Sequence, residues 1–129
     1  MKMQLEHIAI NVPDPVAMAD WYVEHCDMKI VLQIDEPPFT RFLADQQGKT
    51  CIEVYKNTVA PIPDYTTQSH FIYHHAFAVK DLLHTKETLL EAGATYVEEV
   101  RQPNGTVLIM LRDHWGVPLQ LVNRVGGWY

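Results

Sequence analysis

The chain repeats itself at an offset of 67 residues, and this internal repeat constrains its fold more than any other feature of the sequence. The segment HIAINVPD (7–14) aligns with HHAFAVKD (74–81), and CIEV (51–54) aligns with PLQL (118–121) at the same offset. A duplicated module of about 55 to 60 residues explains both matches. Because a module of that size is marginal alone, we expect the two copies to share one domain.

Both halves predict the same order of elements: a strand, a helix and three further strands. Asp14, followed by Pro15, and Asp81 are placed to cap the two helices. In the first half we expect strands at 5–12, 28–34, 39–43 and 50–56 and a helix at 16–26; in the second half, strands at 70–79, 95–100, 106–112 and 118–123 and a helix at 82–91. The segment QPNG (102–105) is typical of a hairpin turn. The sequence therefore predicts an α+β fold with modules at about 4–56 and 70–124 and a linker at about 57–69.

Composition narrows the class of protein. The 129 residues carry 16 acidic against 10 basic side chains, a formal net charge of −6, which argues against binding to nucleic acid or to an anionic membrane. No apolar run approaches the roughly 20 residues of a membrane span, and the N-terminus does not read as a signal peptide. Cys26 and Cys51 are far apart and are expected to be reduced thiols. We expect a single cytoplasmic domain over residues 1–129.

The repeat also pairs polar residues. His7 and Glu53 stand 46 positions apart, as do His74 and Gln120 (53 − 7 and 120 − 74). If the two halves pack about a pseudo-two-fold axis, these four residues converge on one point. Two imidazoles, a carboxylate and an amide form a shell for a divalent cation such as Zn, Ni, Co, Mn or Fe, with one or two positions left for water or substrate.

Three segments carry a resemblance to a known family: LEHIAINVPDP (5–15), HHAFAVKD (74–81) and RDHWGVPLQLV (112–122). On these the chain resembles the vicinal oxygen chelate superfamily, which contains glyoxalase I, methylmalonyl-CoA epimerase, extradiol dioxygenases, and fosfomycin- and bleomycin-resistance proteins. The resemblance implies two βαβββ modules that form an open, cupped sheet around a metal. It also implies a homodimer, and it places His7, Glu53, His74 and Gln120 in the ligand positions.

One residue departs from the family pattern. At the end of the second module the family usually has Glu, and this chain has Gln120. In extradiol dioxygenases and fosfomycin-resistance enzymes the single carboxylate comes from the second module, whereas here Glu53 belongs to the first. The order His, Glu, His, Gln resembles the epimerase-type composition with the halves exchanged.

The resemblance and the ligand set together predict a metal-dependent lyase or isomerase of the glyoxalase or epimerase type. The cation would stabilise an enediolate or enolate of a small substrate with vicinal oxygens, and Glu53 would serve as ligand and as mobile general base. Two alternatives stay open. One is an Fe(II) ring-cleaving dioxygenase, and the other is a metal-free binding protein of the bleomycin-resistance type that sequesters a ligand.

Four further side chains are expected to line the concave face and to contact a small-molecule substrate: Phe39, Arg41, Tyr55 and Met110. Arg41 is a candidate contact for a substrate carboxylate or phosphate, and an edge-strand arginine in solvent is an equally good reading. His75 is expected on the opposite strand face from His74. The other histidines are expected at the surface: His25, His70, His84 and His114.

Overall fold

The computed structural model describes residues 1–49 and 51–129. The chain divides into two compact units, Met1–Pro63 and Asp64–Tyr129, and each unit contains one βαβββ module with its own four-stranded mixed sheet. The predicted α+β fold with two such modules is therefore confirmed. Neither helix of the described residues has the length and apolar character needed to cross a bilayer.

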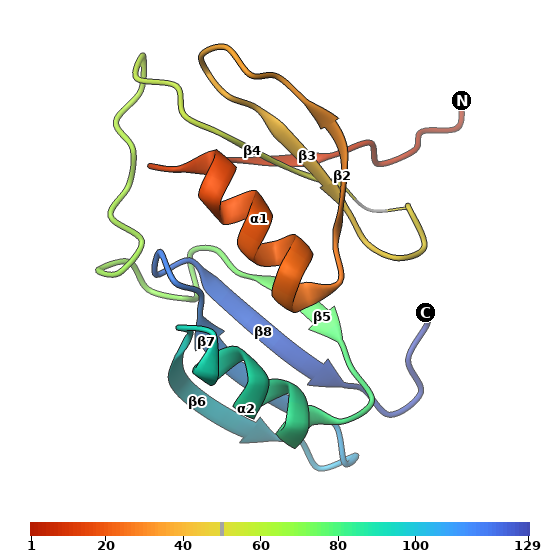
Figure 1. The fold of residues 1–129 in the computed structure, drawn as a ribbon. Coiled ribbons are helices and arrows are strands. Elements are labelled where there is room, and N and C mark those ends of the chain that lie inside the picture. The colour runs from red at the N-terminus through yellow and green to blue at the C-terminus, as the bar shows by residue number, and fades with distance from the viewer. Residues whose placement is uncertain (50) are drawn as a thin grey trace. The chain divides into compact units, whose positions relative to one another are not determined.

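The sheet of the first unit has one parallel pair of strands, which lies at one edge. Its elements are β1 (Ile8–Asn11), α1 (Pro15–Cys26), β2 (Lys29–Gln33), β3 (Arg41–Ala44) and β4 (Cys51–Tyr55), and the strand order is β1-β4-β3-β2. The β1–β4 pair is parallel and the other two pairs are antiparallel. Helix α1 packs across one face of this sheet, against β2, β3 and β4 (Figure 1).

Local sequence explains where α1 begins and which side it buries. The Asp14 carboxylate accepts a hydrogen bond from the backbone N–H of Ala17, and Pro15 occupies the first helical position, where its missing N–H costs nothing. The inward side of the helix is buried against the sheet; it includes Met18, Trp21 and Tyr22. The helix thus leaves the opposite sheet face, which carries Glu53, available for polar side chains.

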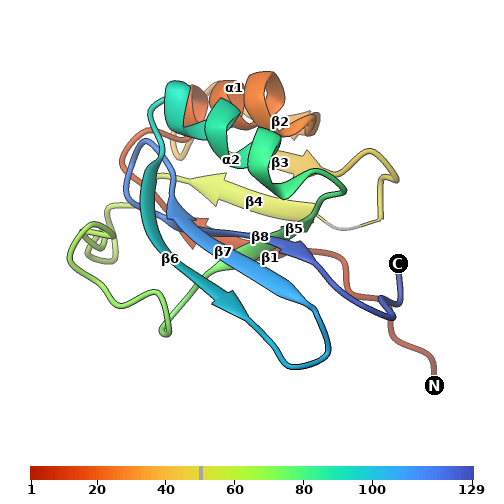
Figure 2. The same ribbon diagram turned by 90° about the horizontal axis from the view of Figure 1, so that it is seen from below.

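The second unit repeats this plan. Its elements are β5 (His75–Ala78), α2 (Leu82–Glu91), β6 (Thr95–Arg101), β7 (Val107–Arg112) and β8 (Pro118–Asn123), in the order β5-β8-β7-β6 (Figure 2). Asp81 caps α2 by accepting from the His84 N–H. Leu89 of α2 is buried, as are Leu119 and Leu121 on the helix-facing side of β8.

Strand register reproduces the sequence repeat. Ala9 pairs with Glu53 in the first unit, and Ala76 pairs with Gln120 in the second, so both partners are shifted by the same 67 positions. The irregularity in the β2–β3 pairing also has its counterpart between β6 and β7. Because side chains alternate along a strand, Glu53 and Gln120 occupy the same place on the same face of their own sheets.

Two expected strands lose half or more of their expected length. The expected strand 70–79 reduces to β5, because residues 70–72 form a turn in which Ser69 accepts hydrogen bonds from the N–H groups of Phe71 and Ile72. The expected strand 5–12 reduces to β1. Of the expected strand 50–56, Thr50 lies outside the described residues, as does the side chain of Cys51.

The segment before His70 is anchored within the second unit by Arg112. Its guanidinium donates to the backbone carbonyls of Tyr65 and Gln68 and to that of Gly116 at the turn before β8, over 2.7–3.0 Å. These hydrogen bonds fix the path of residues 65–68 and hence the start of the turn that carries His70. The C-terminal part of the predicted linker therefore belongs structurally to the second module.

Candidate functional site

In the first unit, His7 and Glu53 face each other. His7 lies just before β1, and its Nε2 is 3.9 Å from Oε1 of Glu53 on β4. Phe42, which is paired with Glu53 across β3 and β4, packs edge-on against the imidazole with ring centroids 5.2 Å apart. The other ring nitrogen, Nδ1, is hydrogen-bonded to the Glu6 carboxylate, which raises the pKa of His7.

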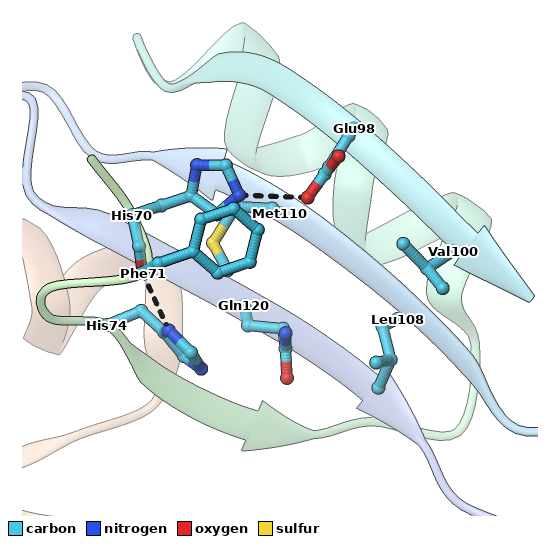
Figure 3. Close-up of a pocket in the computed structure, with 8 residues that line it drawn as sticks. All are labelled: His70, Phe71, His74, Glu98, Val100, Leu108, Met110 and Gln120. Atoms are coloured by element: carbon cyan, nitrogen blue, oxygen red, sulfur yellow. Dashed lines mark hydrogen bonds and ion pairs between the residues drawn. The ribbon is translucent and has the colours of Figure 1, made fainter. Parts of the chain in front are cut away.

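In the second unit, the equivalent residues His74 and Gln120 line a cavity of about 240 Å³ (Figure 3). Nδ1 of His74 lies 3.0 Å from the backbone carbonyl of His70. A carbonyl oxygen only accepts, so Nδ1 is the nitrogen that carries the proton, and Nε2 is the nitrogen at which this tautomer has its lone pair. Figure 3 shows the His74 ring and the Gln120 amide on one side of the sheet.

The two histidines therefore share a hydrogen-bonding pattern. Each uses Nδ1 as a donor to an oxygen outside the strand face, a carboxylate for His7 and a carbonyl for His74. Histidines that bind metals usually make such a bond with one nitrogen, which orients the ring and leaves the other nitrogen for the cation. The residues present thus fit a divalent cation, with Nε2 as the ligand atom in both units.

The structure brings the four predicted ligands together as two pairs, one in each unit. Within residues 1–49 and 51–129, no three His, Cys, Asp or Glu side chains gather into a metal-binding group. A pair of side chains gives too few ligands for a typical four-coordinate protein site. Neither pair by itself therefore makes a four-coordinate site.

The family model described as "Glyoxalase/Bleomycin resistance protein/Dioxygenase superfamily" matches residues 4–121. The chain belongs to this superfamily. The match covers both modules, and it agrees with the repeated strand, helix and three-strand order that the structure shows. The comparison with curated proteins finds no match.

Solved structures share the fold of this superfamily member at low sequence identity. A glyoxalase family protein from Bacillus cereus has a TM-score of 0.79 and 18% identity, with 95% of this chain and 94% of that chain covered. The fosfomycin resistance protein FosX from Listeria monocytogenes, complexed with Mn(II) and sulfate, has a TM-score of 0.74 and 15% identity, with 97% of this chain and 93% of that chain covered. An E144Q mutant of glyoxalase I from Zea mays has a TM-score of 0.73 and 23% identity, with 95% of this chain and 46% of that chain covered.

Among the predicted substrate contacts of this superfamily member, Met110 lines the cavity of the second unit, and Tyr55 lies on the same sheet face as Glu53. Arg41 lies on the opposite face, in register with the buried Val54, and is itself buried. Its guanidinium bonds to the Asp35 carboxylate at 2.9 Å and to the Ile34 carbonyl at 2.8 Å. These contacts hold the β2–β3 connection, so the structure gives no support to Arg41 as an anion contact.

Phe39, the fourth predicted substrate contact, lies in the connection between β2 and β3 rather than in a strand. Its N–H donates to the Glu36 carbonyl at 2.7 Å, and its φ of 58° is in the left-handed region. That backbone conformation ends the extended stretch, which is why β3 begins at Arg41 and not at Phe39 as the sequence indicated. Whether Phe39 contacts a ligand stays a prediction.

Sequence reasoning missed two polar residues of the cavity, His70 and Glu98. Nε2 of His70 lies 2.8 Å from Oε1 of Glu98, and Phe71 packs against the imidazole with ring centroids 4.2 Å apart. The expectation that His70 is a surface group is wrong, because the turn at residues 70–72 brings its ring over the sheet, where 15% of the side chain is exposed. The hairpin turn at 102–105 was the available signal for Glu98, since it sets the register that aligns Glu98 with Met110.

His75, next to His74, points to the buried side of β5. Burial, reinforced by the neighbouring His74, lowers its pKa to about 4. The Tyr73 hydroxyl lies 3.3 Å from its Nδ1, and burial raises the pKa of Tyr73 to about 12. The folded protein thus keeps His75 neutral at pH values where an unfolded chain would protonate it.

This burial predicts a pH-dependent stability. Between pH 6.5 and about 4, His75 is protonated in the unfolded chain and neutral in the folded protein. The free energy of unfolding therefore falls as the pH is lowered through that window, by at most about 3 kcal/mol. Urea unfolding at pH 7, 5.5 and 4.5 measures it. In His75→Gln the fall should be smaller by that amount, whereas His84→Gln, at an exposed position, should follow the wild type. Equal slopes in all three proteins would contradict the assignment.

Proposed function

We propose that this superfamily member is a metal-dependent lyase or isomerase of the glyoxalase or epimerase type. Its divalent cation would be held by His7, Glu53, His74 and Gln120. The observation that carries the proposal is the repeated histidine arrangement, in which Nδ1 is bonded to an oxygen and Nε2 is left as ligand atom. The FosX structure, a complex with Mn(II) and sulfate, is a protein of this fold with a divalent cation.

The donor chemistry supports a cation of intermediate hardness. Imidazole nitrogens suit Zn, Ni, Co and Fe, and the carboxylate and amide oxygens of Glu53 and Gln120 extend the range to Mn. Both pairs are needed, and they come either from one chain or from two copies in a homodimer. The proposal includes a small-molecule substrate that approaches through two adjacent oxygens.

When bound, a divalent cation supplies positive charge beside a substrate carbonyl, which makes the neighbouring C–H more acidic. The proposal assigns that proton to Glu53, and what supports the assignment is a carboxylate that is 19% exposed and lies 3.9 Å from His7. In an isomerisation, Glu53 returns the same proton to the substrate at the other carbon or face, so no external oxidant or reductant is consumed. Gln120 contributes a neutral amide, which leaves the ligand set with a single negative charge.

Metal titration followed by proton exchange tests this proposal. Tag-free protein is dialysed against Zn(II), Ni(II), Co(II), Fe(II) or Mn(II) in turn, and bound metal is counted. We expect about one equivalent for each set of four ligands and metal-dependent exchange of the carbon-bound protons of hydroxyacetone in D₂O, followed by NMR. Less than ~0.1 equivalent of every cation would overturn the proposal.

Two other outcomes would point to the alternative functions. Oxygen uptake with catechols under Fe(II), without proton exchange, would indicate a ring-cleaving dioxygenase. Tight binding of small ligands by metal-free protein, unaffected by His7→Ala and His74→Ala, would indicate a sequestering protein.

A further inference from the structure

The two modules agree at the proposed ligands and differ at the other end of the second module's cavity. The counterpart of His70 in the first module is Met3, by the offset of 67. The counterpart of Glu98 is Leu32, by strand register. Leu32 pairs with Phe42 on β3 as Glu98 pairs with Met110 on β7. The hydrogen-bonded His–Glu pair therefore belongs to the second module alone, and the first module has apolar residues in both places.

Within the pair, the carboxylate is the accessible partner. The His70 side chain is 15% exposed, and that of Glu98 is 43% exposed. His70 donates its Nε2 proton to Oε1 of Glu98 at 2.8 Å, which orients the carboxylate. An ionised carboxylate has acceptor sites on both oxygens, so Glu98 can accept a further hydrogen bond from a ligand in the cavity.

Strand geometry separates this pair from the proposed metal ligands. Glu98, Met110 and Gln120 are in register across β6, β7 and β8. Neighbouring strands lie about 4.8 Å apart, so Glu98 and Gln120 are about 10 Å apart across the sheet. The Glu98 carboxylate and the Gln120 amide therefore enter the cavity from strands that are not neighbours.

The surface between the two ends is apolar. Met110 lies between Gln120 and Glu98, Leu108 and Val100 line the cavity farther along the same strands, and Phe71 lines it from the turn (Figure 3). Such a surface favours a hydrocarbon or aromatic group, whose burial releases water from both partners. Across the strands, the cavity thus has the polar Gln120 amide on one side, the apolar Met110 in the middle and the Glu98 carboxylate on the other side.

We propose that Glu98 is a specificity-determining residue that binds a hydrogen-bond donor, a hydroxyl or an ammonium group, at the far end of an elongated substrate. The apolar body of that substrate lies over Leu108 and Met110, and its vicinal oxygens face His74 and Gln120. His70 is a positioning residue that holds the Glu98 carboxylate. The assignment of the oxygen-bearing end rests on the proposed metal function; recognition of the donor by Glu98 does not.

Three catechols that differ only in the 4-substituent test this inference: 2-hydroxyethyl, 2-aminoethyl and propyl. Their dissociation constants are measured by calorimetry with Zn(II)-loaded and with metal-free protein. We expect both donor-bearing probes to bind about tenfold more tightly than the propyl probe, because a hydrogen bond to a charged group outweighs the loss of one apolar carbon contact. The ratio between probes reports on Glu98, and the effect of Zn(II) reports on the proposed function.

The variants use the first module's own residues. Glu98→Leu should abolish the preference without weakening propyl binding, and His70→Met should reduce it about threefold while the backbone bond to His74 persists. Glu99→Gln is the matched control, because the neighbouring carboxylate projects from the other strand face and should leave the preference unchanged. An unchanged preference in Glu98→Leu, or no measurable binding of any probe in either metal state, would overturn the inference.

Discussion

Replacing His74 by alanine should lower the affinity for Zn(II) by at least about 100-fold, as should replacing His7. Each substitution removes one of two imidazole ligands, and loss of even an outer hydrogen-bond partner of a ligand typically costs 10–100-fold. Calorimetric titration of tag-free protein measures the effect. Equal losses in both variants are expected, since one histidine stands in each unit and the proposed site needs both.

Exposed His84 provides the matched control, and His84→Ala should bind Zn(II) like the wild type. Mixing the two variants that bind Zn(II) weakly adds a second measurement. If the pairs come from two chains of a homodimer, mixing His7→Ala with His74→Ala restores about a quarter of the sites, because half of the dimers regain one intact site. If both pairs come from one chain, mixing restores none. A loss confined to one variant would contradict the four-ligand site.

Replacing Gly116 by alanine should destabilise the protein by about 2–4 kcal/mol. Gly116 has φ of 84°, and an added Cβ would lie 2.5 Å from Cγ2 and 2.9 Å from the backbone N of Thr66. The left-handed conformation costs an alanine about 1 kcal/mol, and forced overlap with backbone costs a further 1–3 kcal/mol. Gly116 ends the turn that leads into β8, so the strand that carries Gln120 depends on it.

Gly48→Ala separates the two contributions. Gly48 has a similar φ of 71°, but nothing lies within 4 Å of the position that a Cβ would take. This control should lose only about 1 kcal/mol, the conformational part. Urea unfolding of both variants measures the difference. Equal losses would show that the contact with Thr66 relaxes at no cost.

The fold could be predicted because its determinants are local or repeated. Asp14 and Asp81 begin the helices through their own side chains, and the Asn-Gly turn at 104–105 specifies a hairpin. The offset of 67 then supplied the rest, since equal spacing of His7 from Glu53 and of His74 from Gln120 reappears as equal strand register. Repetition turned weak local signals into a specific topology.

The far side of the second module's cavity could not be predicted, because it depends on contacts between distant segments. The sequence around His70 alternates like a strand, but Ser69 and the Arg112 guanidinium bend this segment back over the sheet. For Arg41 the strand was predicted but the face on which the side chain lies was not. Its strand was located to within two residues, but pairing with β4 places Arg41 beside Val54, on the face opposite to Glu53, and only that pairing decides the face.

The Arg112 anchor shortens the connection between the two modules. It fixes residues 65–68 within the second unit, and in the first unit Asn57 is hydrogen-bonded to Asn11 and to the Val59 N–H, so the connection between these anchors runs through residues 60–64. The six Cα–Cα steps from Val59 to Tyr65 span at most about 20 Å. A tether this short gives each module an effective concentration in the millimolar range around the other. A longer insertion at residues 60–63 would lower that effective concentration without altering a contact within either module.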